Sequence, residues 1–420
     1  MFRINLFLKF SQFIKAIFLS YDKKICEETI SNEIKNQTKK KKILITSQCR
    51  VGFLYLLKYL RINLKNKNEI IFVSYNLAEM INVAKNLKYR IKFIDLQYKN
   101  GAIDLKELIK ITSKKTCAIV LTNMFNNYSD SLKIKKFCNI KEIKLIEDNA
   151  IFFDNFTKRN KDKIYSGSLG DYTLYSFNIM KHISAFFGGA IATNDKNFYK
   201  YFMNEREKMK TFHKIKLLKQ ITIFLILKLM SIKILYKVFF FYVIKYAHIK
   251  KRKFLLELFY PSLKFKKYHF NKSYFTSVSN LTLKSTYLQI LDRKYRADCF
   301  KQRKMKNIYY QKKLIKLGEK NINLIKIKDF NYQNYIDYPI LVKDKKKLNS
   351  YLLKRGFEIR YLYYKNCEPI FSKVKNHCNN SKKYEKELIC LPNHKKITFK
   401  YIDKLLINIG NFYNLDKSNH

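Results

Sequence analysis

The sequence predicts an α/β fold in which a doubly wound, mostly parallel sheet is covered by helices on both faces. From residue 43 onwards, short runs rich in β-branched and other apolar residues alternate with helical stretches. Most of the strand-like runs have a continuous apolar centre, as expected for strands that are buried on both faces. Only 9 glycines and 4 prolines occur in 420 residues, so linkers of low complexity are not expected.

The elements of this sheet follow one another in a regular order. Strands are expected at 43–47, 69–75, 90–96, 117–125 and 143–148, and helices at 53–62, 77–87, 104–112 and 131–140. Ligands of such sheets bind at the carboxyl ends of the strands, so chemistry is expected near Ser47, Tyr75, Asn123 and Asp148. Two further strand-like pieces, at 172–177 and 188–194, flank a short turn that contains Lys181.

Two segments outside this pattern are apolar but studded with lysine. Residues 1–42 are predicted as an N-terminal amphipathic segment, because Lys9 and Lys15 interrupt the apolar residues and no small-residue cleavage site follows. Residues 206–275 form a basic, hydrophobic insertion, in which lysines interrupt every apolar run before the roughly 18 residues of a spanning helix. Two interpretations of the insertion stay open: it lies in a membrane interface, or it is an internal pair of helices with its lysines in solvent.

A smaller α+β unit is predicted at the C-terminus. A long helical stretch from about 277 leads into the run 338–344, a helix near 346–355, the segments 355–364 and 389–398, and a closing helix from 399. This pattern indicates a large domain at 43–290, which contains the insertion, and a small C-terminal domain at 291–420.

The formal net charge of +54 would suit nucleic acid or an anionic membrane as a partner. Lys, Asn, Ile, Phe and Tyr dominate everywhere, however, and a codon bias toward A and T produces the same pattern without any partner. The charge is spread along the chain, and no zinc-finger or helix-turn-helix spacing occurs, so nucleic acid is not expected.

The 8 cysteines are widely scattered, and no two of them have C-x-x-C spacing. Neither a metal site nor a redox motif is therefore expected. Reduced, mostly buried thiols in a cytoplasmic chain are the simplest interpretation.

Two residues have a setting that suits chemistry on an aldehyde cofactor. Lys181 lies on a short turn between two strands and ahead of the Gly-Gly pair at 188–189, where an aldehyde can reach an amine that loses its proton. Asp148 follows an apolar strand, so its carboxylate can pair with a pyridinium nitrogen at the strand's carboxyl end. On position alone, Asp148 is equally well interpreted as a helix cap or turn residue.

The segments LIEDNA (145–150), GSLGDYTLYSF (167–177), NIMKHIS (178–184) and GGAIATND (188–195) resemble the DegT/DnrJ/EryC1/StrS family of sugar aminotransferases. The resemblance covers most of 43–205 and 277–413. It implies a type I pyridoxal-phosphate-dependent (aspartate-aminotransferase-like) fold with a large sheet domain and a small α+β domain. It also implies a homodimer.

The resemblance assigns roles to five residues. Lys181 matches the lysine that forms the Schiff base with pyridoxal 5'-phosphate and then moves a proton, and Asp148 matches the partner of the pyridinium nitrogen. Ser176 matches the phosphate-binding serine. Cys49 and Arg50 stand where relatives have Gly-Thr, at a helix N-terminus that would hold the phosphate. The alternative for Arg50 is a solvated surface residue.

The chain also departs from the family pattern. Ile151 replaces a Gln or His, Leu77 replaces the aromatic that stacks on the ring, and Phe187 replaces a glutamate before Gly-Gly. The family's G-x-N-Y-R segment is not recognisable near 273–278. Related dehydratases carry a histidine in place of the lysine; here Lys181 precedes His182 and keeps the aligned position, which favours amino transfer over dehydration.

The resemblance implies transfer of an amino group from glutamate to a keto-sugar, linked to a nucleotide or to a lipid, for surface polysaccharide or related amino-sugar synthesis. It implies a cytoplasmic chain, with contact to the inner face of the membrane through 206–275 left open. Two alternatives remain: an impaired member of the same fold that acts as a binding or regulatory protein, and a charge-driven protein that binds membrane surfaces or nucleic acid.

Overall fold

The computed structural model describes residues 2–4, 6–18, 20–124, 128–159, 162–259, 270, 272–317, 321–326, 334–362, 364–372 and 377–413. The larger sheet contains β1 (Lys42–Thr46), β2 (Glu69–Val73), β4 (Arg90–Ile94), β5 (Thr116–Thr122), β6 (Lys144–Asp148), β9 (Tyr172–Ser176) and β10 (Gly189–Thr193). Their order is β1-β10-β9-β6-β5-β2-β4. Strands β4, β2, β5, β6 and β9 run parallel, and β10 is antiparallel to both of its neighbours, so the mostly parallel sheet is confirmed.

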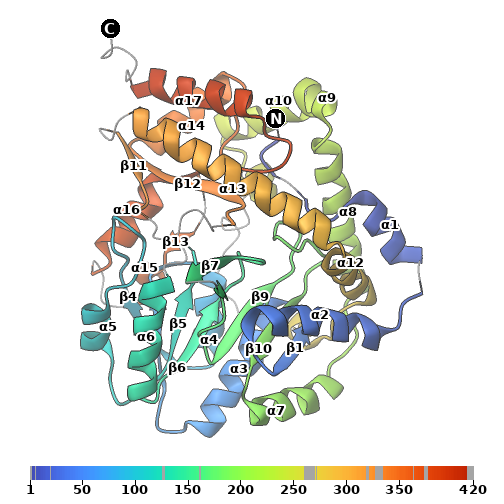
Figure 1. Ribbon diagram of the computed structural model, residues 1–420, viewed down its shortest axis with the longest axis vertical. Helices are drawn as coiled ribbons and strands as arrows, with labels where there is room; N and C mark the ends of the chain where they lie inside the picture. The colour runs from blue at the N-terminus through green and yellow to red at the C-terminus, as the bar shows by residue number, and fades with distance from the viewer. Residues whose placement is uncertain are drawn as a thin grey trace.

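Helices cover both faces of this sheet (Figure 1). They are α2 (Lys23–Thr38), α3 (Cys49–Asn63), α4 (Ala78–Asn86), α5 (Leu105–Ile111), α6 (Tyr128–Ile140), α7 (Lys196–Glu207) and α12 (Asn280–Leu291). Helices α3, α4 and α7 share a core with Ile70 and Phe72, whereas α5 and α6 share a second core with Ile71 and Val73. Because successive residues of a strand point to opposite faces, the uninterrupted apolar runs supply both cores at once.

Some helices and strands begin or end at residues other than the expected ones. Helix α3 begins at Cys49, four residues before the expected start, and β2 ends at Val73. The next residues form β3 (Tyr75–Asn76), which pairs with β13 (Lys365–Asn366) far along the chain. A hairpin of β7 (Phe156–Arg159) and β8 (Asp162–Tyr165) was not expected.

The N-terminal segment is helical only in part. Helix α1 spans only Phe10–Phe18, and the described residues before it are not helical but lie buried. The Arg3 side chain is enclosed and ion-paired with Glu358, with 3.3 Å between Nε and Oε1, and the Phe7 N–H donates to Ser184 Oγ at 3.1 Å. The described residues before α1 therefore form a buried N-terminal strip, whose partners lie 355 and 177 residues away in the sequence.

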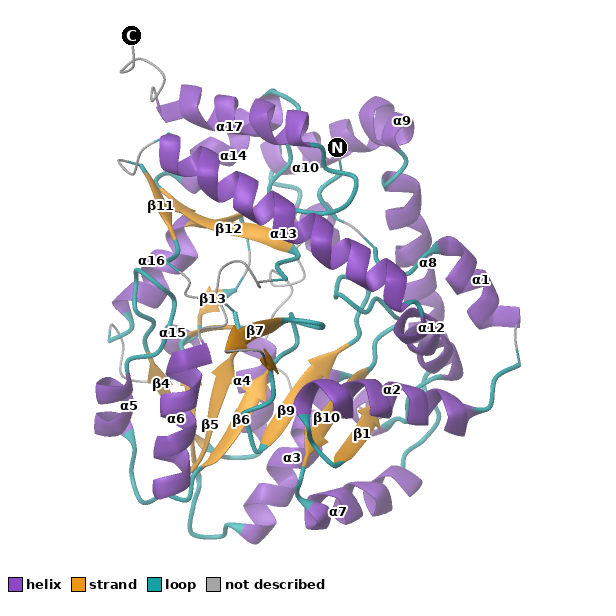
Figure 2. Cartoon of the chain, viewed as in Figure 1, coloured by secondary structure: helices purple, strands orange, loops and turns teal. Residues whose placement is uncertain are grey.

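The smaller sheet has the order β11-β12-β14, with β11 (Ile322–Leu324), β12 (Asp337–Val342) and β14 (Leu388–Pro392). Figure 2 shows this sheet under a layer of helices. The helices of this region are α13 (Arg293–Lys316), α14 (Lys345–Lys354), α15 (Glu368–Phe371), α16 (Asn379–Glu387) and α17 (Phe399–Tyr413). The closing helix begins at 399 as expected. Within the described part of 355–364, only a bridge from Arg360 to Cys390 is regular. The domain boundaries themselves stay a prediction.

Most of the described part of the insertion is helical. It contains α8 (Lys214–Met230), α9 (Lys233–Leu235), a π-helical turn (Tyr236–Phe240), α10 (Phe241–Ile249), α11 (Lys253–Phe259) and a 3₁₀ turn (Lys272–Phe275). One side of these helices packs in a core with the N-terminal strip and Leu353 of α14. The internal packing that was expected as one of two interpretations is therefore present. Among the described residues, no helix has the length and hydropathy needed to cross a bilayer.

Candidate active site

A pocket opens at the carboxyl ends of the central strands. Strand β6 ends at Asp148, β9 ends at Ser176, and helix α3 begins at Cys49 beside the first residue of β10, Gly189. The pocket is lined by Gln48, Cys49, Arg50, Leu77, Glu79, Met80, Asp148, Ala150, Ser176, Asn178, Lys181, Phe187, Gly188 and Tyr364. All five candidates from the sequence, Cys49, Arg50, Asp148, Ser176 and Lys181, thus line one pocket.

Lys181 lies in the loop between β9 and β10 and is held through its backbone. Its N–H donates to Asn178 O at 2.9 Å, and its carbonyl accepts from Ser184 Oγ at 2.9 Å. These bonds leave the side chain to enter the pocket. Burial lowers the pKa of Lys181 below its usual value, and the Asp148 carboxylate opposes that shift. The amine thus has a larger neutral fraction than a surface lysine.

Asp148 is buried at the end of β6. Its Oδ1 accepts from the Ala150 N–H at 3.1 Å, and its carbonyl accepts from the Asn123 N–H at 3.0 Å. Burial raises the pKa of Asp148, while the Ala150 N–H and the Lys181 charge counteract it. A positive group placed in the pocket would stabilise the ionised carboxylate further.

The first turn of α3 gives the pocket an anion-binding end. Val51 and Gly52 donate their N–H groups to Gln48 O, at 3.0 and 3.2 Å, so the helix begins at the pocket wall. N–H groups in a first helical turn have no intrahelical acceptor, and the helix dipole favours negative charge there. Arg50 adds a guanidinium, and it also lowers the pKa of Glu79, which burial raises.

Gly189 is the residue that allows β10 to pass close to the start of α3. A Cβ at this position would lie 2.5 Å from the Cys49 nitrogen and 2.8 Å from Tyr175 O, which are both backbone atoms. Backbone atoms cannot rotate away as a side chain can, so a glycine is needed where β10 passes the start of α3. The Gly-Gly pair thus sets the distance between the anion-binding end and the Lys181 loop.

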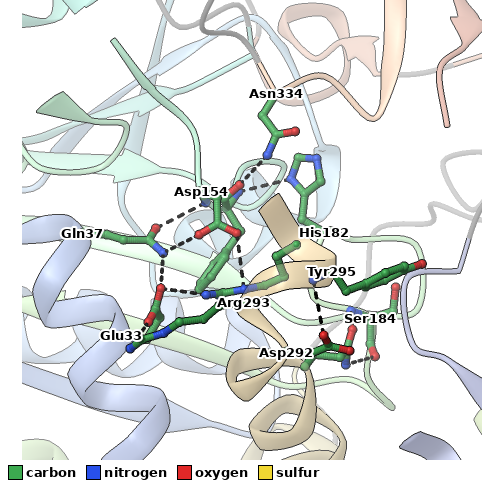
Figure 3. Close-up of polar contacts among 12 residues, drawn as sticks. Glu33, Gln37, Asp154, His182, Ser184, Asp292, Arg293, Tyr295 and Asn334 are labelled. Atoms are coloured by element: carbon green, nitrogen blue, oxygen red, sulfur yellow. Dashed lines mark hydrogen bonds and ion pairs between the residues drawn. The ribbon is translucent and has the colours of Figure 1, made fainter. Parts of the chain in front are cut away.

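His182 does not line this pocket, and Figure 3 shows its ring beside Asn334. Its Nδ1 accepts from the Phe153 N–H at 3.2 Å, and its ring lines a different small pocket with Arg303 and Asn334. Burial and the positive charge of Arg303 hold the pKa of His182 well below its usual value, so the ring is neutral. Lys181, and not His182, therefore occupies the site.

This placement predicts a structural role for His182. His182→Ala leaves the buried Phe153 N–H without an acceptor, so the free energy of unfolding will fall by about 1–3 kcal/mol. His182→Asn offers an amide oxygen near the position of Nδ1 and will lose less. Urea unfolding of the two variants checks this order; equal losses would contradict the hydrogen-bonding role.

The departures from the family pattern lie in different places. Leu77 and Phe187 line the pocket, whereas Ile151 lines a separate small pocket beside Asp337 and Arg360. Phe187 has a positive φ of 73° and packs on Phe212, with 5.6 Å between the ring centroids. Of the other strand ends that the sequence singled out, Ser47, Tyr75 and Asn123 do not line the pocket.

Two residues near the site were missed by the sequence reasoning. Tyr364 brings an aromatic ring into the pocket from the C-terminal part of the chain and packs on Tyr75, at 6.1 Å between centroids. Arg360 lowers the pKa of Lys181 and is ion-paired with Asp337 at 2.9 Å. The sequence pattern of their segment, 355–364, does not indicate a site, because only the tertiary fold brings this segment to the pocket. Among the described residues, no group of three or more His, Cys, Asp or Glu side chains is placed to hold a metal ion.

Part of the chain is similar in sequence to known proteins. Residues 26–214 match the model of the DegT/DnrJ/EryC1/StrS aminotransferase family. GDP-perosamine synthase of Escherichia coli O157:H7 is 25% identical over 143 residues, which are 34% of this chain and 38% of that protein. The chain spans about a third of the length of the curated relatives that it matches.

Solved structures match over nearly the whole chain. Helicobacter pylori PseC, an aminotransferase involved in the biosynthesis of pseudoaminic acid, has a TM-score of 0.68 at 15% identity, covering 96% of this chain and 95% of its own. A GDP-4-keto-6-deoxymannose-3-dehydratase, whose structure holds a trapped PLP-glutamate geminal diamine, has a TM-score of 0.66 at 17% identity and covers 96% and 97%. These likenesses confirm the type I fold of pyridoxal-phosphate-dependent sugar aminotransferases.

Proposed function

We propose that the protein is a pyridoxal 5'-phosphate-dependent aminotransferase, because residues 26–214 match the model of the DegT/DnrJ/EryC1/StrS aminotransferase family. It moves an amino group from glutamate to a keto-sugar carried on a nucleotide, for surface polysaccharide or related amino-sugar synthesis. The observation that carries the proposal is that Lys181 and Asp148 line one pocket, with the N-terminus of α3 in its wall.

The side chains of the pocket fit this cofactor by their chemistry. Asp148 is a buried carboxylate for a protonated ring nitrogen, and Lys181 is an amine of lowered pKa for the aldehyde. Ser176, Arg50 and the first turn of α3 are donors for a phosphate. Tyr364 and Phe187 bring aromatic side chains to the pocket, whereas position 77 is a leucine.

Each residue has a defined task in the reaction. Pyridoxal phosphate, when bound, supplies an aldehyde and an electron-withdrawing ring. Lys181 would hold the cofactor through its amine and would move a proton at the α-carbon of the amino donor. Asp148 would hold the proton on the ring nitrogen and orient the ring. Ser176 and the α3 N-terminus would hold the phosphate.

Two curated relatives and two solved structures are named for a dehydration. Lys181 favours amino transfer instead, because a lysine can attach the cofactor and His182 lines a different pocket. Retention of Lys181 and Asp148 in one pocket also favours an enzyme over a binding protein of the same fold.

All 8 cysteines are thiols without a disulfide, which supports a cytoplasmic location. The homodimer stays a prediction, which light scattering on the purified chain tests.

The proposal is tested by following the nitrogen. The purified protein, loaded with pyridoxal phosphate, is incubated with ¹⁵N-glutamate and a panel of 4-keto- and 3-keto-sugar nucleotides. We expect ¹⁵N in the product sugar and an equal amount of 2-oxoglutarate. Formation of a deoxygenated sugar with release of ammonia would instead indicate a dehydratase. Absence of 2-oxoglutarate with every acceptor would overturn the aminotransferase.

The lowered pKa of Lys181 predicts a pH dependence of cofactor capture. Only the neutral amine attacks an aldehyde, so the capture rate rises with pH and reaches half its maximum below the usual lysine pKa of about 10.5. The Asp148 carboxylate raises the pKa of Lys181, so Asp148→Asn will shift that midpoint to lower pH. Stopped-flow absorbance across a pH series measures both midpoints; a shift to higher pH would contradict the stated interaction.

A further inference from the structure

The insertion exposes a large apolar surface. Of 29 large apolar side chains exposed among the described residues, 14 lie within the 44 residues of 214–257. They are Ile215, Leu218, Leu225, Ile226, Leu229, Ile232, Ile234, Leu235, Val238, Phe239, Tyr242, Tyr246, Ile249 and Phe254. Single exposed apolar residues are ordinary on protein surfaces, but a concentration of this kind marks an interaction surface.

The helices that carry this surface are apolar on two opposite sides. Along the π-helical turn and α10, the inner side buries Tyr236, Ile244 and Ala247. The outer side repeats at intervals of three and four residues, as one face of a helix does. Its members are Leu235, Phe239, Tyr242, Tyr246 and Ile249. The outer side is therefore a continuous apolar stripe that the protein's own core does not use.

The stripe is held rigidly against the rest of the molecule. Tyr236 packs on Phe2, with 5.5 Å between the ring centroids, and its hydroxyl donates to Glu358 Oε2 at 2.9 Å. Phe224 of α8 packs on Phe13 of α1 at 5.0 Å. Helix α1 accordingly lies beside α8 (Figure 1). It adds four exposed apolar side chains, Phe10, Ile14, Ile17 and Phe18. We name the exposed apolar side chains of α1 and 214–257 the outer face.

The segment that carries most of the outer face has charges of a single sign. Residues 208–256 contain 13 Lys and Arg and no Asp or Glu. Lys228 is turned inward, where its Nζ donates to Leu6 O at 3.4 Å and burial lowers its pKa to about 8. A second copy of the chain would bring the same positive charge against this face, so electrostatics disfavour self-association there. A surface of anionic lipid complements it, because each nearby Lys or Arg contributes about 1 kcal/mol of attraction.

We propose that the outer face lies on the surface of a membrane that contains anionic phospholipid. Its apolar side chains enter the boundary between headgroups and acyl chains, while the flanking lysines contact lipid phosphates. No helix in the described ranges is suited to cross the bilayer, so the helices lie in its plane. This surface is separate from the residues proposed for catalysis, so the proposal stands or falls independently of amino transfer.

The test must separate apolar insertion from the general attraction of a chain with charge +54. The full chain is sedimented with phosphatidylcholine vesicles and with vesicles that also contain phosphatidylglycerol. Val238→Gln with Phe239→Gln removes two side chains that are 72% and 60% exposed without changing the charge. Ile140→Gln, on α6 and 78% exposed, is the matched control. Thermal unfolding and amino transfer of each variant confirm that the fold is retained.

We expect the wild type to bind only the anionic vesicles, and binding to weaken with salt. The double variant will bind at least tenfold more weakly, and Ile140→Gln will bind as the wild type does. Equal binding by the double variant, or equal binding to neutral vesicles, would overturn the proposal. So would a solution dimer of the wild type that the double variant splits into monomers, because the outer face would then be an interface between two copies.

Discussion

Lys181→Ala will lose the visible absorption band that pyridoxal phosphate gives to the wild-type protein, and its amino transfer will fall by at least about 10⁴-fold. The substitution removes both the amine that attaches the cofactor and the group that moves the proton. No other lysine lines the pocket, so within the described residues no neighbour can take over. Absorption spectra and the ¹⁵N-transfer assay measure the two losses.

A matched control is Lys40→Ala. Lys40 is also partly buried, and burial lowers its pKa too, but it lies near Glu147 and Asp171 and does not line the pocket. This variant should keep the band and the activity. If Lys40→Ala loses the band while Lys181→Ala keeps it, the site has been assigned to the wrong lysine.

Asp148→Asn will retain the cofactor's band but lower kcat for amino transfer by about 10²- to 10³-fold, as removal of one electrostatic group from an active site commonly does. An amide cannot hold the proton on the ring nitrogen, so the ring withdraws electrons less strongly. The side chain keeps its shape, so the fold should survive. Single-turnover reaction with glutamate isolates the affected step from substrate binding.

The adjacent carboxylate provides the control for this variant. Glu147 points to the other side of β6, where its Oε2 accepts from the N–H groups of Leu169 and Gly170 at 2.9 and 2.6 Å. Glu147→Gln weakens these bonds and should lower the free energy of unfolding, with kcat per folded molecule unchanged. An equal loss of kcat in both variants would show that Asp148 acts only through the stability of the strand.

The sequence was most informative where structure is set by local patterns. Uninterrupted apolar runs such as 117–121 predicted buried parallel strands, because both faces of such a strand are covered. The N-terminus misled because the run from Phe2 to Leu8 mixes apolar and polar residues in a way that suits a strand as well as a helix. Its state was decided by Glu358 and Ser184, which supply its hydrogen-bond partners.

The sequence by itself determined the fold class and placed Asp148 at the carboxyl end of a strand, and the family resemblance singled out Ser176 and Lys181. Chain direction puts strand ends at one edge of a parallel sheet, but it did not exclude Ser47, Tyr75 and Asn123, which do not line the pocket. Only the tertiary structure decided that Tyr364 enters the pocket, that His182 leaves it, and that the insertion presents one apolar side outward. Such contacts join residues far apart in the chain, and they depend on packing that no local periodicity records.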